Sequence, residues 1–181
     1  MSRITVPSRE TAPASSQPLL DAVDKQLGVV PNLFRLVGLS PAALQGYLSM
    51  NGALGKTLDV KTRERIALAV AQVNGCDYCL SAHDYLGRNV AKLSGNEIDA
   101  ARDFHSEDAR ANAALRFTRR VVELRGRVSD TDLATLRDAG FDEAATVEIV
   151  VTVALNVLTN YVNNVAQTDI DFPKVTAKPV A

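Results

Sequence analysis

The chain has 181 residues, of which 46% are hydrophobic and 23% charged, and aromatic residues make up only 5%. This composition favours a single soluble domain with a core of Leu, Val, Ala and Ile packed between helices. The 20 basic and 21 acidic residues are spread along the chain and give a net charge of -1. That balance excludes the basic surface expected of a protein that binds nucleic acid or anionic lipid.

The pattern along the chain predicts one domain between two irregular ends. Residues 1–18 have no apolar periodicity and no signal-peptide core, so we expect a flexible N-terminal arm and a cytoplasmic protein. Residues 19–172 have helical periodicity without a dividing linker, which predicts a single-domain, all-α helical bundle. Pro173 and Pro179 indicate an irregular tail over residues 173–181. No segment is both long enough and uncharged enough to span a membrane.

Helix start and stop signals divide the domain into a series of elements. Ser40 before Pro41 is a typical N-cap followed by proline at the first helical position. Ser94, with Glu97 three residues later, resembles a capping box. We expect helices over residues 19–27, 33–37, 41–54 and 59–73, a helix from about residue 76, one after residue 94, and helices over 108–125, 130–140 and 143–167.

The last long segment, residues 143–167, combines a β-branched apolar run with a polar stripe. Its length and its helical neighbours favour a buried helix over a strand. Asn156, Asn160, Asn163 and Asn164 are spaced to lie on one side of that helix. They could line an active-site pocket or form hydrogen bonds across a helix interface, and the second role is favoured because buried amides need partners.

The chemistry of the chain is concentrated around its only two cysteines, Cys76 and Cys79. On a helix, Cys79 lies about 60° from Cys76 around the axis and His83 about 20° from it, so the three share a face. The preceding Asn74-Gly75 pair is a typical helix stop. It places the cysteines at the start of a new helix, where free N–H groups and the helix dipole favour thiolate over thiol.

A thiolate beside a second thiol can reduce a peroxide. The thiolate attacks the distal oxygen and becomes a sulfenic acid, which the second thiol converts to a disulfide. His83 can act as acid or base near neutral pH. Glu64 would orient His83 if the preceding helix folds back beside the cysteines, a contact that helical spacing cannot establish.

Other roles for these residues are weaker. A structural zinc site needs four ligands, and the only other histidine, His105, lies in a polar stretch that we expect at the surface. Inert core cysteines would not require a histidine on the same helical face. Glu64 could instead be a solvated residue paired with a neighbouring arginine. We therefore expect no metal and no cofactor.

These residues also carry a family resemblance. The pattern E-x11-C-x2-C-x3-H is read at Glu64, Cys76, Cys79 and His83. It resembles the signature of alkylhydroperoxidase D-like proteins in the carboxymuconolactone decarboxylase superfamily. Val-Pro-Asn-Leu-Phe at residues 30–34 and Asn-Tyr-Val-Asn at residues 160–163 are similar to segments of the peroxidase-related branch.

The resemblance implies roles that the spacing alone does not assign. Cys79 would be the peroxidatic thiol, Cys76 the resolving thiol, and His83 with Glu64 a proton relay. It also implies a helical bundle that assembles into homo-trimers or hexamers. The substrate would be a hydroperoxide, and the reductant an external dithiol such as a lipoyl group or a thioredoxin-like protein. Tyr78 stands where some relatives have histidine, which removes one possible proton shuttle.

Two further functions use the same cysteine pair without peroxide turnover. One is a thiol–disulfide oxidoreductase that acts on a partner protein or a lipoyl group. The other is a redox sensor in which oxidation changes assembly. A lactone decarboxylase is disfavoured, because the cysteine pair would have no role in that reaction.

Overall fold

The computed structural model describes residues 2–178, and within this range the chain forms nine α-helices and no β-strand. The prediction of an all-α fold is therefore confirmed. The helices are α1 Gln17–Leu27, α2 Asn32–Val37, α3 Pro41–Leu54, α4 Val60–Val73, α5 Asp77–Asn89, α6 Gly95–Arg102, α7 Ala109–Leu124, α8 Asp130–Asp138 and α9 Glu143–Ala166.

Side-chain caps fix most of the helix starts where the sequence signals place them. The Ser40 hydroxyl accepts a hydrogen bond from the Ala43 N–H and caps α3. The capping box at Ser94 is present, with Glu97 bonded back to the cap backbone. The helix α1 starts at Gln17, two residues before the expected position. These local bonds satisfy N–H groups that a helix start leaves free, so they set the boundaries independently of the core.

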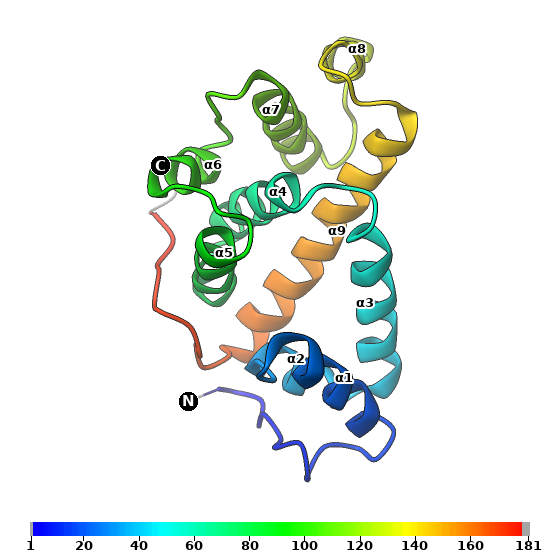
Figure 1. The fold of residues 1–181 in the computed structure, drawn as a ribbon, viewed down its shortest axis with the longest axis vertical. Coiled ribbons are helices and arrows are strands. Elements are labelled where there is room, and N and C mark those ends of the chain that lie inside the picture. Colours follow the sequence, from blue (N-terminus) through cyan, green and yellow to red (C-terminus); the bar gives the residue numbers. More distant parts are fainter. Residues whose placement is uncertain (1, 179–181) are drawn as a thin grey trace.

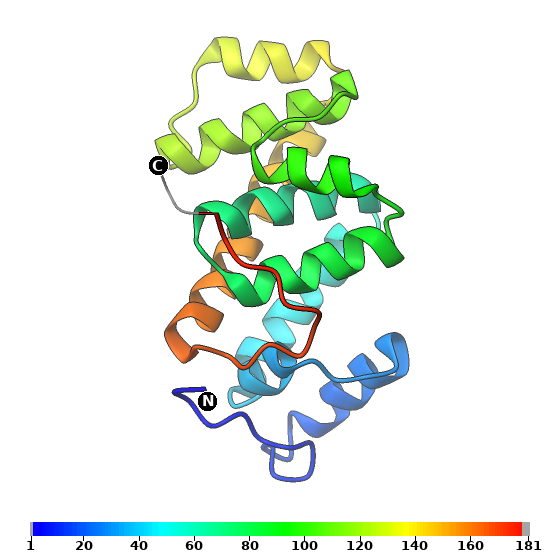
Figure 2. The same ribbon diagram turned by 90° about the vertical axis from the view of Figure 1, so that its left-hand side faces the viewer.

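The helix α4 lies at the centre of the bundle and packs against α5, α6, α7 and α9 (Figures 1 and 2). Its two faces join two apolar clusters. Leu68 packs in a cluster with α5 residues such as Leu80, and Ile66 packs in a second cluster with Phe117 of α7 and Ile149 of α9. Because both faces are buried, α4 is a rigid platform for any side chain it carries.

The helix α9 runs diagonally past α4 and α3 (Figure 1). It is the one helix in residues 2–178 long and apolar enough to span a membrane, and 33% of its most apolar window is buried. The expectation that no segment has this length and composition was therefore wrong. Buried polar residues such as Asn160 and Asn163 interrupt its inner face. It packs against α2, α3, α4, α5 and α7, so it connects most of the bundle.

The C-terminal segment after α9 is irregular but hydrogen-bonded to the bundle. It runs as an extended strap along α5 (Figure 2). The Val175 N–H donates to the Ser81 hydroxyl at 2.9 Å, and the Ala177 N–H donates to the Asp77 carboxylate at 2.8 Å. The remainder of the predicted tail, which includes Pro179, lies outside the described residues.

Candidate active site

The turn between α4 and α5 places the two cysteines. Gly75 has a φ of +59°, a left-handed conformation that glycine adopts readily. The chain then re-enters a helix at Cys76, whose sulfur accepts a hydrogen bond from the Cys79 N–H at 3.3 Å. Cys76 is thus the N-cap of α5, and Cys79 lies in its first turn. The sequence predicted both cysteines in that turn, whereas in the structure Cys76 is the residue just before it.

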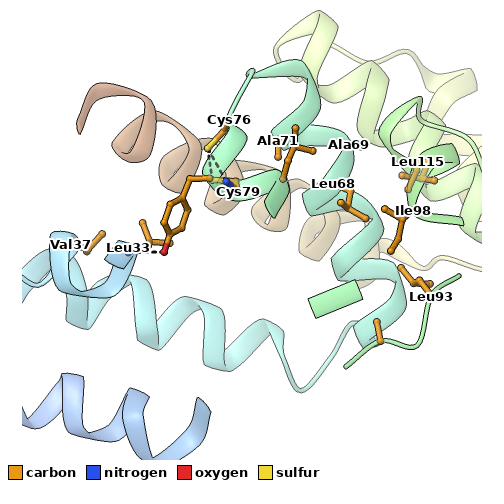
Figure 3. Packing of buried hydrophobic residues seen from close by; sticks show 14 of the residues in the cluster. Leu33, Val37, Leu68, Ala69, Ala71, Cys76, Cys79, Leu93, Ile98 and Leu115 are labelled. Atoms are coloured by element: carbon orange, nitrogen blue, oxygen red, sulfur yellow. Dashed lines mark hydrogen bonds between the residues drawn. The ribbon is translucent and has the colours of Figure 1, made fainter. Parts of the chain in front are cut away.

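The two sulfurs are in direct contact. The distance between Cys76 Sγ and Cys79 Sγ is 2.7 Å, and both residues are free cysteines (Figure 3). This separation exceeds the S–S bond length of about 2.05 Å. Cys76 is fully buried and Cys79 is 3% exposed. The pair is therefore a reduced dithiol in which one sulfur can donate its proton to the other.

The surroundings shift the pKa values of the two thiols in opposite directions. The hydrogen bond from Cys76 lowers the pKa of Cys79 to about 7, against the opposing effect of burial and with help from the charge of His83. The same hydrogen bond, together with burial, raises the pKa of Cys76. Cys79 is therefore the thiolate near neutral pH, and Cys76 is the thiol that stabilises it.

His83 and Glu64 form an ion pair next to the cysteines. His83 Nδ1 lies 2.8 Å from Glu64 Oε2, which joins α5 to the buried platform α4. Burial alone would lower the pKa of His83, but the Glu64 carboxylate raises it above its ordinary value. A protonated imidazole near Cys79 stabilises the thiolate and can donate a proton. The structure thus brings Glu64 to the position that the sequence could only suggest.

Two asparagines of α9 complete the surroundings of Cys79. The Asn163 amide donates a hydrogen bond to Cys79 Sγ at 3.3 Å. Asn160 is fully buried, and its Oδ1 accepts from Asn74 Nδ2 at 2.9 Å. The Asn160 amide also lowers the pKa of Cys79. The helix-interface role favoured for this stripe was incomplete, because Asn163 also donates to the reactive thiol.

The other asparagines of the stripe have different roles. Asn164 donates to the Asn74 backbone carbonyl at 2.8 Å, so it ties α9 to the turn before the cysteines. Asn156 donates to the Thr152 carbonyl within α9. The sequence signal for Asn163 was its place in the Asn-Tyr-Val-Asn segment, but the periodicity alone could not separate it from Asn164.

Tyr78 is a structural link between α5 and α2. Its hydroxyl accepts a hydrogen bond from the Leu33 N–H at 3.1 Å, and its ring packs edge-on against Phe172 with centroids 5.9 Å apart. Burial raises the pKa of Tyr78. Tyr78 therefore stays protonated and holds the Val-Pro-Asn-Leu-Phe segment against the cysteine helix. His105, by contrast, is exposed, as the sequence predicted.

A small polar cavity of about 50 Å³ borders the ion pair. Its lining includes Glu64, His83, Arg63, Asn156 and Tyr47. A polar space of this size can hold a water molecule with several hydrogen-bond partners, which is what a proton relay requires. Within residues 2–178, no group of three or more His, Cys, Asp and Glu side chains could hold a metal ion.

Comparison with known proteins links part of the chain to a family. Residues 41–123, which include both cysteines, match the model of the carboxymuconolactone decarboxylase family. A 45-residue segment is 51% identical to an uncharacterized protein of Haemophilus influenzae, and this match covers 24% of the chain and 40% of that protein.

Solved structures match almost the whole chain. A peroxidase-related protein from Ralstonia eutropha JMP134, described as an alkylhydroperoxidase AhpD core, has a TM-score of 0.83 and 25% identity, and covers 94% of this chain and 92% of its own. The debrominase Bmp8, bound to 2,3,4-tribromopyrrole, has a TM-score of 0.77 and 20% identity, and covers 94% of both chains.

The family match, the helical fold and the paired cysteines define one class of protein. The match over residues 41–123 and the likeness to the solved peroxidase-related structure support an alkylhydroperoxidase D-like member of the carboxymuconolactone decarboxylase superfamily.

Proposed function

We propose that the protein is a thiol-dependent peroxidase in which Cys79 reduces a hydroperoxide. The observation that carries this proposal is the pairing of Cys79, with its pKa lowered to about 7, and the thiol of Cys76 at 2.7 Å. A reactive thiolate and a resolving thiol in contact are the two groups that a peroxidase cycle needs. The relatives with peroxidase-related names support the same reaction.

The cycle follows from these groups. The Cys79 thiolate attacks the distal oxygen of ROOH, the O–O bond breaks, and the alkoxide leaves with the bonding electron pair. The His83–Glu64 pair supplies the proton that converts the alkoxide to ROH. Cys76 then attacks the Cys79 sulfenic acid, which releases water and forms the Cys76–Cys79 disulfide. An external dithiol, of the lipoyl or thioredoxin-like class, restores both thiols and becomes a disulfide itself.

A single-turnover experiment tests this function. Reduced protein would be mixed with one equivalent of an organic hydroperoxide and followed by intact mass and by free-thiol content. We expect rapid loss of both thiols as a disulfide, and a one-oxygen adduct on Cys79 in the Cys76→Ser variant. Cys79→Ser should abolish peroxide consumption. Peroxide consumption that survives in Cys79→Ser would contradict the assignment.

The same site supports a second redox role without peroxide. A thiol–disulfide oxidoreductase would use the Cys79 thiolate against a protein or lipoyl disulfide, and a redox sensor would change its assembly on oxidation. Rate constants with peroxide and with a disulfide substrate distinguish the oxidoreductase from the peroxidase. A comparison of the molecular mass of the oxidised and the reduced assembly tests the redox sensor. Both roles and the peroxidase cycle need reduced thiols, so we propose a cytoplasmic location.

The debrominase in the comparisons indicates a third chemistry for this fold. Its ligand is a brominated aromatic ring. Incubating the reduced protein with 2,3,4-tribromopyrrole and measuring released bromide distinguishes this activity from peroxide reduction. A peroxidase should release no bromide above the level of the Cys79→Ser variant.

A further inference from the structure

An apolar groove is lined by residues of α2, α3 and α9. These three helices pack against one another (Figure 1). Its volume is about 560 Å³, and among the described residues no charged side chain lines it. The side chains that form its walls include Leu36, Ala43, Met50, Leu158 and Val162. A concave apolar space of this volume is typical of a site for a small organic molecule.

The groove and the polar cavity meet at two side chains. Tyr47 and Leu155 line both spaces. On one side of this pair lies the apolar groove, and on the other lies the cavity that contains Glu64 and His83. A molecule with an apolar body and a polar reactive end would therefore find matching surroundings on the two sides of Tyr47 and Leu155.

Tyr47 itself has a free donor at this junction. Its ring packs edge-on against Phe34 of α2, with centroids 5.7 Å apart, which holds the side chain in place. Its hydroxyl makes no hydrogen bond with any described residue. Burial raises the pKa of Tyr47, and the negative charges of Cys79 and Glu64 raise it further. The residue is therefore a phenol at neutral pH and can donate but not lose its proton.

We propose that Tyr47 is a specificity-determining residue, which admits a hydroperoxide with its apolar group in the α3–α9 groove and its peroxide group in the polar cavity. This inference rests on the proposed peroxidase function. The phenol of Tyr47 donates a hydrogen bond to the oxygen that carries the apolar group. When Cys79 attacks the other oxygen, this bond stabilises the alkoxide that leaves, and the proton comes from His83.

Two glycines of α3 provide a matched test. Gly46 lines the groove, and a Cβ added there meets nothing within 4 Å, so a larger side chain would project into the groove without a clash. Gly52 is equally open but does not line the groove. We expect Gly46→Leu to lower the ratio of the rate constants for cumene hydroperoxide and hydrogen peroxide by about tenfold. Gly52→Leu should leave that ratio unchanged.

The phenol has its own variant. Tyr47→Phe keeps the ring and the contact with Phe34 but removes the donor. We expect kcat/KM for cumene hydroperoxide to fall about three- to tenfold, the effect of one lost hydrogen bond. An unchanged kcat/KM in Tyr47→Phe would overturn the role of the hydroxyl.

A binding measurement separates the groove from the chemistry. The alcohol 2-phenyl-2-propanol, the product of cumene hydroperoxide, would be titrated into reduced wild-type protein and followed by calorimetry. We expect saturable binding that Gly46→Leu removes and Gly52→Leu retains. If the alcohol does not bind and the two variants have equal ratios of rate constants while peroxide turnover persists, the groove is not the substrate site. Groove-dependent binding without any peroxide turnover would instead support an apolar ligand site and overturn the peroxidase.

A second copy of the chain could also cover this groove. In that case Gly46→Leu would lower the mass of the assembly in solution and leave the ratio of peroxide rate constants unchanged. That combination would overturn Tyr47 as a specificity-determining residue.

Discussion

Cys79 owes its acidity to neighbours that all stabilise its negative charge. The thiol of Cys76, the imidazole of His83 and the amide of Asn163 act together against the cost of burial. A pKa of about 7 means that the thiolate population rises with pH through neutrality. We expect the rate of peroxide reduction to rise about tenfold per pH unit below pH 7 and to level off above it.

Stopped-flow measurement of thiol loss between about pH 5 and 9 checks this dependence. A rising limb centred near the ordinary cysteine value of 9 would contradict it. The control is alkylation by iodoacetamide, which reports the thiolate of Cys79 directly and should follow the same curve.

Asn163 and Asn164 are neighbours in sequence with different effects on this thiol. Asn163 donates to Cys79 Sγ, whereas Asn164 donates to a backbone carbonyl of the preceding turn. A hydrogen bond to a charged group contributes about 1.5 kcal/mol, so we expect Asn163→Ala to raise the pKa of Cys79 by about one unit. Asn164→Ala should leave that pKa unchanged. The pH dependence of iodoacetamide alkylation measures both, and equal curves for the two variants would remove Asn163 from the site.

At the scale of elements, the hydrogen bond from Leu33 to Tyr78 ties α2 to α5. The Leu33 N–H is a free donor at the start of α2, and the Tyr78 hydroxyl is its partner at 3.1 Å. Tyr78→Phe would leave this buried N–H without an acceptor. We expect it to lower the free energy of unfolding by about 1–2 kcal/mol, measured by urea denaturation.

Tyr85 provides the control for this link. It also contacts Phe172, but it is exposed and its hydroxyl makes no hydrogen bond with the described residues. Tyr85→Phe should change stability by less than about 0.5 kcal/mol. Equal losses in Tyr78→Phe and Tyr85→Phe would show that the hydroxyl of Tyr78 does not hold α2 in place.

The sequence predicted those elements whose signals are local. Caps such as Ser40 and Ser94 and the stop at Gly75 act within a few residues, so the helix boundaries could be read from the chain. The contact between Glu64 and His83 depends on how α5 folds back on α4, and the contact of Asn163 with Cys79 depends on where α9 crosses. Helical periodicity carries no information about how helices cross, so the residues around the thiolate could not be predicted from the sequence.

At the scale of the whole molecule, the two faces of α9 have different surroundings. Its inner face carries Asn160 and Asn163, which are buried at the cysteines. Its outer face is apolar and exposed at Val147, Val150, Leu158, Tyr161 and Val165. These residues recur at helical spacing and form a stripe along one side of α9, which we call the outer stripe.

The outer stripe is the surface that we expect to be covered by a second copy of the chain. Long exposed apolar patches on soluble proteins mark interaction sites, and the family resemblance implies trimers or hexamers. Val165 is 65% exposed, so Val165→Lys adds a charge to the stripe without disturbing the core. We expect it to lower the mass measured by light scattering after size-exclusion chromatography from that of an oligomer toward that of a 19.4 kDa monomer.

Val90 is the matched control for the outer stripe, because it is 57% exposed and lies at the end of α5, outside the stripe. Val90→Lys should keep the mass of the wild-type assembly. Dissociation by Val90→Lys and not by Val165→Lys would place the interface at α5 instead. Leu158 belongs both to the outer stripe and to the wall of the apolar groove. Assembly through the stripe would therefore place the second subunit next to the groove. Dissociation by Val165→Lys should then also weaken the preference for cumene hydroperoxide over hydrogen peroxide.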